Sequence, residues 1–297
     1  MKKTIIIGSC HADLITYVKE LPKGNEEVIR IRDDVSTDGG GYRSALLYAK
    51  LKLPYELISV IGNGVYGDQT VQALRKAGIS FRKQEEETAG CTYRLIDQGG
   101  HEGVFCAAGN EYDFDSEAAE ETDLDETGYI LVNSEILSGQ DPDELIWFLE
   151  EAEKPVILVL KDRLQEIDEN VMDAVMALHP ILILNENESW ISGVAEEELS
   201  VRAEALHEMN ENIVVILTEE GSYFIDEDGS GMSEREDPAE PCWFAAALSA
   251  ALTAGVDLKN SIVFADEASA QFEDSFTPEE EDAEPLRKRL VEMIQHA

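Results

Sequence analysis

Several residues of this sequence are of a type and spacing that can do chemistry. Asp13 follows a short apolar run, and its carboxylate can accept two charge-assisted hydrogen bonds or cap the end of a strand. Asn185 and Glu188 follow another apolar run; they offer the oxygen ligands that Mg²⁺ prefers, and they also fit a variant of the helix capping box. Cys242 precedes a small-residue helical stretch, and a helix N-terminus lowers the pKa of a thiol. We disfavour a Cys242 nucleophile, because no well-placed His is visible.

The elements that must position these residues form an alternating pattern. Continuous Ile/Leu/Val runs at 129–132, 156–160, 181–184 and 213–217 are separated by acid-rich stretches with helical spacing. Strands that are apolar throughout are typical of a parallel sheet covered by helices on both faces. The second half of the chain therefore predicts a doubly wound α/β arrangement.

The N-terminal half has a different pattern. In chain order we expect a strand at 5–7 and extended segments from about 12 to 35. A helix at 42–51, a strand at 56–61 and a helix at 69–77 with Gly78 as its C-cap should follow. A hairpin then pairs 92–96 with 103–106. Near the C-terminus we expect a helix at 243–254 and an acidic, solvated connection at 273–285. We predict one α/β domain over 1–297, with a doubly wound parallel sheet and a small β-sheet lid inserted from about 11–35 and 88–110.

Charge limits the classes of partner. The 297 residues include 63 acidic and 23 basic ones, for a formal net charge of −40. Such a surface repels phosphate backbones and anionic lipid, so we expect neither nucleic-acid nor membrane binding. An anionic substrate is also disfavoured unless local Lys or Arg override the field. Solubility or a salt-adapted host is the ordinary interpretation of such a charge, and the sequence does not distinguish either from a partner that needs it.

The four cysteines contain no C-x-x-C pair and no nearby zinc ligands. Scattered thiols in a chain of this size indicate a reducing compartment, so we expect a cytoplasmic protein. The apolar run near the start is too short for a signal peptide, and no window is long enough to span a bilayer.

The order of these motifs resembles the ribokinase-like, or PfkB-type, carbohydrate kinase family, from about residue 5 to about 270. The resemblance implies a large α/β domain that binds ATP and a β lid that closes over a sugar. It implies ATP-dependent, Mg²⁺-assisted transfer of the γ-phosphoryl group to a hydroxyl of a sugar or nucleoside.

The resemblance also implies roles on the sugar side. Asp13, in GSCHADL, falls where the family has an Asp that accepts hydrogen bonds from sugar hydroxyls. In TDGGGYRSALLYAKL, Gly39 and Gly41 fall on the family's glycines and Arg43 on its Asn. Arg43 only donates and carries charge, so it can bind an anionic ligand group or form a salt bridge to Asp13. Glu135 falls near a position where some members have a sugar-contacting Glu.

On the nucleotide side, ILILNENES resembles the family's N-x-x-E segment, which implies that Asn185 and Glu188 organise hydrated Mg²⁺. ILTEEG resembles the nucleotide motif T-x-G-x-x-G only in part. Gly221 matches, whereas Ile216 and Thr218 stand at the Thr and first Gly positions.

The family's G-A-G-D motif, which forms the anion hole and supplies the base, falls on Ala239, Glu240, Pro241 and Cys242 when FAAALSAAL is aligned with the following helix. Pro241 lacks an N–H, Glu240 puts a carboxylate where phosphate charge develops, and an unperturbed thiol is a poor base. Losing a base typically costs about 10²–10⁴ in rate, and losing one anion donor about 10²–10³. Asp237 is a possible substitute base.

Three interpretations remain open at this stage. The first is a catalytically impaired pseudokinase that binds a sugar, nucleoside or related small molecule. The second is an active sugar or nucleoside kinase with a rebuilt anion-hole loop. The third is a non-catalytic interaction protein that forms a homodimer through apolar lid residues, since family members often pair through the lid. Those lid residues are Tyr93, Leu95, Val104 and Phe105.

Overall fold

The computed structural model describes residues 1–25, 27–82, 86–161, 163–194, 197–235, 239–273 and 278–296. Its main feature is an eight-stranded sheet, counted over these residues, in the order β12-β11-β10-β9-β8-β7-β1-β4. The strands are β1 (Lys3–Ile7), β4 (Tyr55–Ile58), β7 (Thr127–Asn133), β8 (Val156–Leu160), β9 (Ile181–Asn185), β10 (Val214–Thr218), β11 (Gly221–Asp226) and β12 (Gly229–Glu234). All neighbours from β4 to β10 pair in parallel, and β11 and β12 add an antiparallel hairpin.

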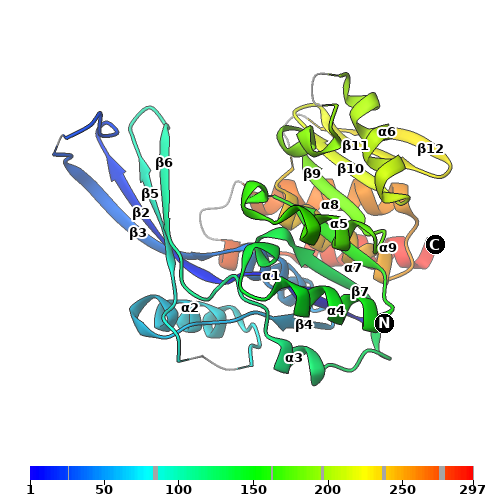
Figure 1. Cartoon of the computed structure of the whole chain (residues 1–297), viewed down its shortest axis with the longest axis horizontal. Coiled ribbons are helices and arrows are strands. Elements are labelled where there is room, and N and C mark those ends of the chain that lie inside the picture. Colours follow the sequence, from blue (N-terminus) through cyan, green and yellow to red (C-terminus); the bar gives the residue numbers. More distant parts are fainter. Residues whose placement is uncertain are drawn as a thin grey trace.

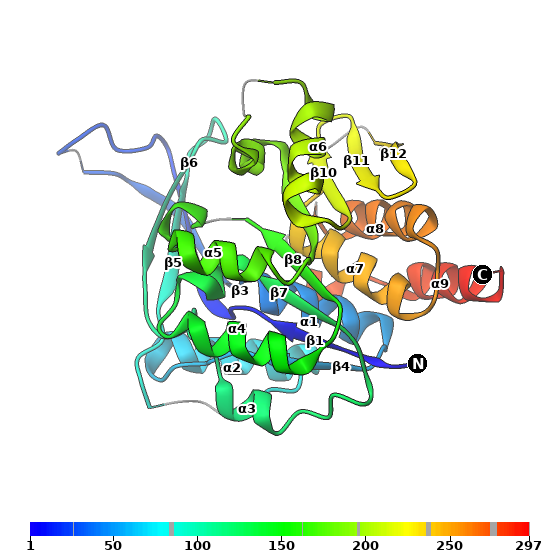
Figure 2. The ribbon, with the colours of Figure 1, turned by 45° about the vertical axis from the view of Figure 1, so that its right-hand side comes forward.

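Helices cover both faces of this sheet, as the apolar runs predicted (Figure 2). The helices are α1 (Gly40–Leu51), α2 (Gly64–Ala77), α3 (Ser116–Glu120), α4 (Pro142–Ala152), α5 (Glu169–Met176), α6 (Leu199–Asn210), α7 (Pro241–Thr253), α8 (Leu258–Glu273) and α9 (Glu284–His296). On one face of the sheet, α1, α7, α8 and α9 contribute to one buried apolar cluster; on the opposite face, α4, α5 and α6 contribute to the other. Short 3₁₀ helices are η1 (Ser134–Ser138), η2 (Leu164–Glu166), η3 (Glu186–Ser192) and η4 (Pro278–Glu280). The α/β class is confirmed.

A second, four-stranded sheet projects from the body (Figure 1). Its order is β3-β2-β5-β6, from β2 (His11–Val18), β3 (Arg30–Asp38), β5 (Cys91–Ile96) and β6 (Glu102–Ala107). The β2–β3 and β5–β6 pairs are antiparallel, whereas β2 and β5 pair in parallel and join the two insertions. Residues 11–18 and 30–38 therefore form one edge of this lid sheet and 91–107 the other.

Element boundaries differ from the expectations in several places. The strand expected at 56–61 ends at Ile58, and the hairpin β11–β12 was not foreseen. Helix α7 begins at Pro241, two residues before the expected start, because proline suits the first helical turn. Gly78 does end α2 in the left-handed conformation.

The acidic connection at 273–285 is not simply solvated. Within its described part, the Tyr42 hydroxyl donates to the Glu279 carboxylate, and the Lys50 ammonium donates to the carbonyls of Glu279 and Glu281. Ala283 is buried. The connection is thus fastened to α1. In the described part of the chain, no helix has the length and apolarity needed to cross a membrane.

Candidate functional site: a lid-covered cleft with an internally capped helix

Parallel strands end at one edge of the large sheet, beneath the base of the lid. The residues that follow β1, β7 and β8 include Ser9, Glu135 and Lys161, and β9 and β10 end at Asn185 and Thr218. The carboxyl edge of such a sheet is where α/β folds bind ligands. Two cavities of about 380 Å³ and about 770 Å³ open here between body and lid, and both are lined by Asp38, Arg43 and Arg94.

The glycine run packs closely against the end of β1. A Cβ added to Gly41 would lie 2.4 Å from the carbonyl oxygen of Gly8, and one added to Gly39 would lie 2.3 Å from that of Ser9. Gly39 also has a φ of 114°, which favours glycine. The run therefore lets α1 begin directly against the β1 end.

Glu135 lies at this junction. Its Oε1 accepts from the backbone N–H and hydroxyl of Ser9, at 3.2 and 3.1 Å, and from the N–H of Gly40 at 3.3 Å. Glu135 and Gly40 both line the smaller cavity. The structure thus brings Glu135 together with the glycine segment.

The N-terminus of α7 is capped by the side chain of Glu240. Its Oε2 accepts from the backbone N–H groups of Cys242, at 3.0 Å, and Trp243, at 3.1 Å. Ser269, on α8, holds the backbone of Glu240 in place, because its hydroxyl accepts from the Glu240 N–H at 2.9 Å. The N–H groups that a helix N-terminus offers to an anion are therefore bound to a carboxylate of the chain itself.

Two cations complete the shell around Glu240. Arg43 Nη1 lies 2.8 Å and Lys161 Nζ 2.5 Å from Oε1. Burial raises the pKa of Glu240, but Arg43 and Lys161 outweigh it and lower the pKa to about 2. Glu240 is thus ionised at neutral pH, and its carboxylate accepts from N–H groups that an external anion at this helix N-terminus would need. The residues around α7 do not fit a nucleotide γ-phosphate in this arrangement.

The ion pairs continue from Arg43 into the lid. Arg43 makes a bidentate pair with Asp38, at 2.6 and 2.9 Å, and Arg94 bridges Asp38, at 3.3 Å, to Asp13, at 2.8 Å. Burial raises the pKa of Asp38, but Arg43 outweighs it and holds that pKa well below its usual range. The salt bridge between Arg43 and Asp13, one of the two alternatives for Arg43 in the sequence analysis, is wrong. Asp13 pairs with Arg94 instead.

Cys242 lies in the first turn of α7 and is buried. Burial and then the neighbouring Glu240 charge raise the pKa of this thiol far above its usual value. The helix N-terminus does not activate Cys242, since Glu240 already occupies it. Pro241 is the first residue of α7 and has no N–H, and Ala239 is buried beside it.

Two of the residues expected on the nucleotide side, Thr218 and Gly221, shape the turn between β10 and β11. The Thr218 hydroxyl donates to the carbonyl of Gly221 at 2.8 Å and closes the turn between β10 and β11. Gly221 has a φ of 134°, and a Cβ there would lie 2.0 Å from the carbonyl of Ser233. Asn185 stands at the N-cap position of η3, but its side chain makes no capping bond within the described residues, so the capping-box expectation is wrong. Glu188 follows in η3. Asp237 lies outside the described residues.

Sequence reasoning missed many residues of the cleft, among them the charged residues Asp38, Arg94, Lys161 and Glu279. Two signals could have found some of them. Arg94 alternates with the apolar Tyr93 and Leu95, which places a charge on the opposite face of β5. Lys161 directly follows the wholly apolar strand β8, at the carboxyl edge of the sheet.

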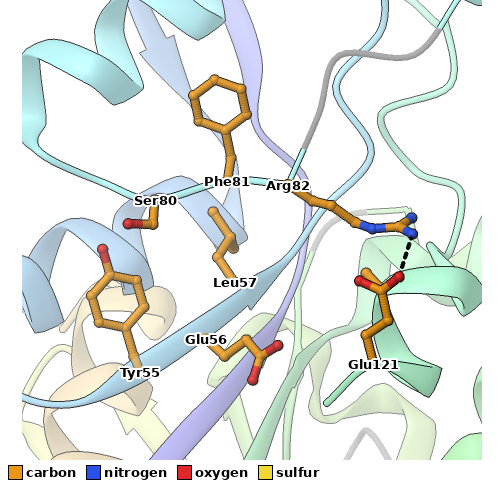
Figure 3. A pocket seen from close by; sticks show the side chains of 8 residues that line it. Tyr55, Glu56, Leu57, Ser80, Phe81, Arg82 and Glu121 are labelled. Atoms are coloured by element: carbon orange, nitrogen blue, oxygen red, sulfur yellow. Dashed lines mark hydrogen bonds and ion pairs between the residues drawn. The ribbon is translucent and has the colours of Figure 1, made fainter.

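A further cavity of about 280 Å³ lies at the β4 edge, away from this cleft (Figure 3). Its one described arginine, Arg82, pairs with Asp115, Glu117 and Glu121 at 3.1–3.2 Å. Glu56 is likewise paired with Lys3 and accepts from Thr122. These partners satisfy the polar lining, so we do not include this cavity in the site.

Comparison with solved structures shows which fold this chain has. Ribokinase from Thermotoga maritima matches with a TM-score of 0.82 at 18% identity, over 98% of this chain and 100% of that one. Arabidopsis thaliana ribokinase, solved with ribose and ATP, matches with a TM-score of 0.80 at 18% identity, over 100% and 99%. A Burkholderia thailandensis nucleoside kinase, solved with inosine, matches with a TM-score of 0.71 at 15% identity, over 97% of each chain. The fold is that of the ribokinases.

Sequence comparison supports a more definite statement. Residues 1–272 match the family model described as pfkB family carbohydrate kinase, and the chain belongs to that family. It is 31% identical over 75 residues to a deoxyribokinase of Salmonella typhimurium, covering 25% of this chain and 24% of that protein. It is 24% identical over 215 residues to Arabidopsis thaliana ribokinase, covering 68% and 54%. The matched segments thus span about a quarter to a half of these curated relatives.

Proposed function

We propose that this carbohydrate kinase family member binds a small polyhydroxylated molecule, a sugar or nucleoside, beneath its lid and does not transfer a phosphoryl group. The observation that carries the proposal is the Glu240 side chain, which binds two N–H groups of α7 together with Arg43 and Lys161. These are the donors that would otherwise stabilise a transferring phosphoryl group. We take Ala239–Cys242 to stand in place of the family's G-A-G-D.

Electrostatics oppose a phosphate at this position. A carboxylate at hydrogen-bonding distance from the same donors repels a phosphate oxygen in a region where water screens little. Displacing Glu240 would leave its own charge without the partners that lower its pKa. The thiol of Cys242, with its raised pKa, does not replace the family's carboxylate base.

The sugar side of the cleft supports retained ligand binding. Asp13 is buried, and its Oδ1 accepts no hydrogen bond from the described residues. Asp13 also lines the larger cavity, and a carboxylate there is a suitable acceptor for ligand hydroxyls. Glu135 and the Gly39–Gly41 segment lie beside it at the base of the lid. Relatives of the same fold solved with ribose or inosine make a sugar or nucleoside the ligand class to test.

We also propose that the chain forms a homodimer through the outer face of the lid. Val35 pairs with Leu14, Leu14 with Tyr93, and Tyr93 with Phe105, so these side chains share one face of the sheet. Val35 is 51% and Phe105 54% exposed. Val104, which the sequence analysis counted among the apolar lid residues, lines the smaller cavity instead of this face. The four cysteines are free, which suits a cytoplasmic location.

Calorimetric titration tests the ligand-binding proposal. The protein is titrated with a panel of pentoses, hexoses and nucleosides, with and without Mg²⁺ and ATP, and ADP is measured in the same samples. The proposal expects binding of at least one panel member with no ADP formed above the buffer blank. ADP formation that depends on a panel member would refute it, and so would the absence of any binding.

A further inference from the structure

An apolar cavity of about 260 Å³ opens between α3 and α4, which lie side by side in both views (Figures 1 and 2). Within the described residues it shares no lining residue with the two cavities of the cleft. Two aromatic rings in its wall, those of Phe114 and Phe148, pack with their centroids 5.7 Å apart. The apolar wall is completed by Ala119, Leu124 and Ala152. This α3–α4 cavity is therefore a site separate from the cleft.

An exposed tryptophan and three glutamates border this cavity. The Trp147 side chain is 59% exposed although it lines an apolar cavity. Glu144 and Glu151 stand three residues before and four residues after it, so all three share one side of α4. Glu120 contributes a third carboxylate from α3. Among the described residues these carboxylates have no ion-pair or hydrogen-bond partner, and the described lining contains no Lys, Arg or His.

The size and charge of the α3–α4 cavity limit what can fill it. Its volume is below the roughly 300–1,000 Å³ of typical small-molecule sites, and it suits one large side chain. An apolar pocket that takes a single anchor side chain, beside an exposed tryptophan, is typical of the centre of a protein interface. The glutamates at its edge favour a partner with positive charge around that anchor. A second copy of this chain, with its net charge of −40, fits poorly.

We propose that the α3–α4 cavity docks a partner protein through a short basic segment. One large apolar side chain of the segment enters between Phe114, Phe148 and Trp147, and flanking Lys or Arg side chains face the glutamates of the rim. The apolar anchor supplies the affinity, and the charges supply orientation and selection against acidic partners.

Three short peptides test this occupant by calorimetric titration. The first has a phenylalanine between two pairs of lysines, the second has alanine in place of that phenylalanine, and the third has glutamates in place of the lysines. We expect the first to bind, with an affinity that falls as NaCl is raised. The alanine peptide should bind at least about tenfold more weakly, and the glutamate peptide not at all.

Two results with these peptides would overturn the inference. Equal binding of the phenylalanine and alanine peptides would mean that the acidic surface as a whole attracts lysines. No binding of the phenylalanine peptide at millimolar concentration would mean that the α3–α4 cavity does not take such a segment.

Two variants of α4 locate the contact. Trp147→Ala and Glu144→Lys change exposed side chains, and each should weaken the phenylalanine peptide at least about fivefold. Glu150→Lys is the matched control, because Glu150 is exposed on α4 outside the lining and the change in net charge is the same. An affinity that survives both Trp147→Ala and Glu144→Lys, or that falls equally in Glu150→Lys, would refute the assignment.

Other occupants of the α3–α4 cavity have outcomes of their own. If 2-phenylethylamine, which carries the same ring and one cation, binds as tightly as the peptide, the cavity takes a free amine and the inference is wrong. If Trp147→Ala halves the mass of the wild type in light scattering, a second copy of this chain covers the cavity, and the inference is again wrong. Sugar titration and ADP release report on the cleft, so the proposed function stands or falls separately.

Discussion

Arg43 Nη1 lies 2.8 Å from Oε1 of Glu240. Arg43 stands where the resemblance expects Asn, and Glu240 lies in the segment that the resemblance aligns with the family's anion hole. The two differences from the family pattern, at positions 43 and 240, look separate in the sequence, but the two side chains form one ion pair. Each makes the other tolerable, because a lone Glu240 or a lone Arg43 in this cleft would be a poorly solvated charge.

A double-mutant cycle on this pair should show coupling. We expect Arg43→Ala and Glu240→Ala each to destabilise the fold, and the double variant to be more stable than their sum by about 1–3 kcal/mol, since both charges are then gone. The free energy of unfolding in urea measures this. Arg287 and Glu284, an exposed pair on α9, are the control and should couple by less than about 1 kcal/mol. Additive losses at 43 and 240 would contradict the pairing.

Acid should destabilise the protein through Glu240. Its pKa is lowered from 4.5 to about 2 in the folded state, so its contribution is complete above pH 4.5 and is lost as pH falls toward 2. The shift corresponds to roughly 3 kcal/mol at neutral pH. Urea midpoints of the wild type should fall more steeply between pH 5 and 2.5 than those of Glu240→Gln. Parallel curves for the two proteins would show that Glu240 is not held in this way.

The sequence predicted the sheet better than the site. Strands such as β8 and β9 are buried on both faces, so their apolar runs indicate both their structure and their position. The partner of Glu240 could not be predicted, because capping α7 depends on how the chain enters that helix after residue 239. The pairing of Asp13 with Arg94 rather than with Arg43 could not be predicted for a similar reason. Asp13 and Arg94 are brought together by the β2–β5 strand pairing, which joins segments far apart in the chain.

Thiol reactivity should separate Cys106 from the other three cysteines. Cys106 is exposed, whereas Cys10, Cys91 and Cys242 are buried. Burial raises the pKa of Cys10 to about 12, and it raises that of Cys242 as well. We expect one fast-reacting thiol with Ellman's reagent at pH 7.5, which Cys106→Ser removes. Rapid alkylation of Cys242, identified by peptide mapping, would mean that it is activated after all.

The lid dimer predicts a change in mass. The wild type should have the mass of two chains by light scattering, and Phe105→Asp should give the mass of one, because a charge then lies in an apolar interface. Val65→Asp is the matched control, as Val65 is 81% exposed on α2, outside the lid sheet. A monomeric wild type, or a dimer that persists in Phe105→Asp, would rule out this interface.

ADP release tests the central claim most directly. The wild type, Glu240→Ala and the fourfold variant Ala239→Gly, Glu240→Ala, Pro241→Gly, Cys242→Asp are compared with Mg²⁺, ATP and the sugar or nucleoside that binds. We predict no turnover above the blank for the wild type and a measurable rate for the fourfold variant, in which the N–H groups of α7 and a carboxylate base become available. Wild-type turnover in the range of about 1–100 s⁻¹ that is typical of kinases would contradict the claim that Glu240 closes this helix to phosphate.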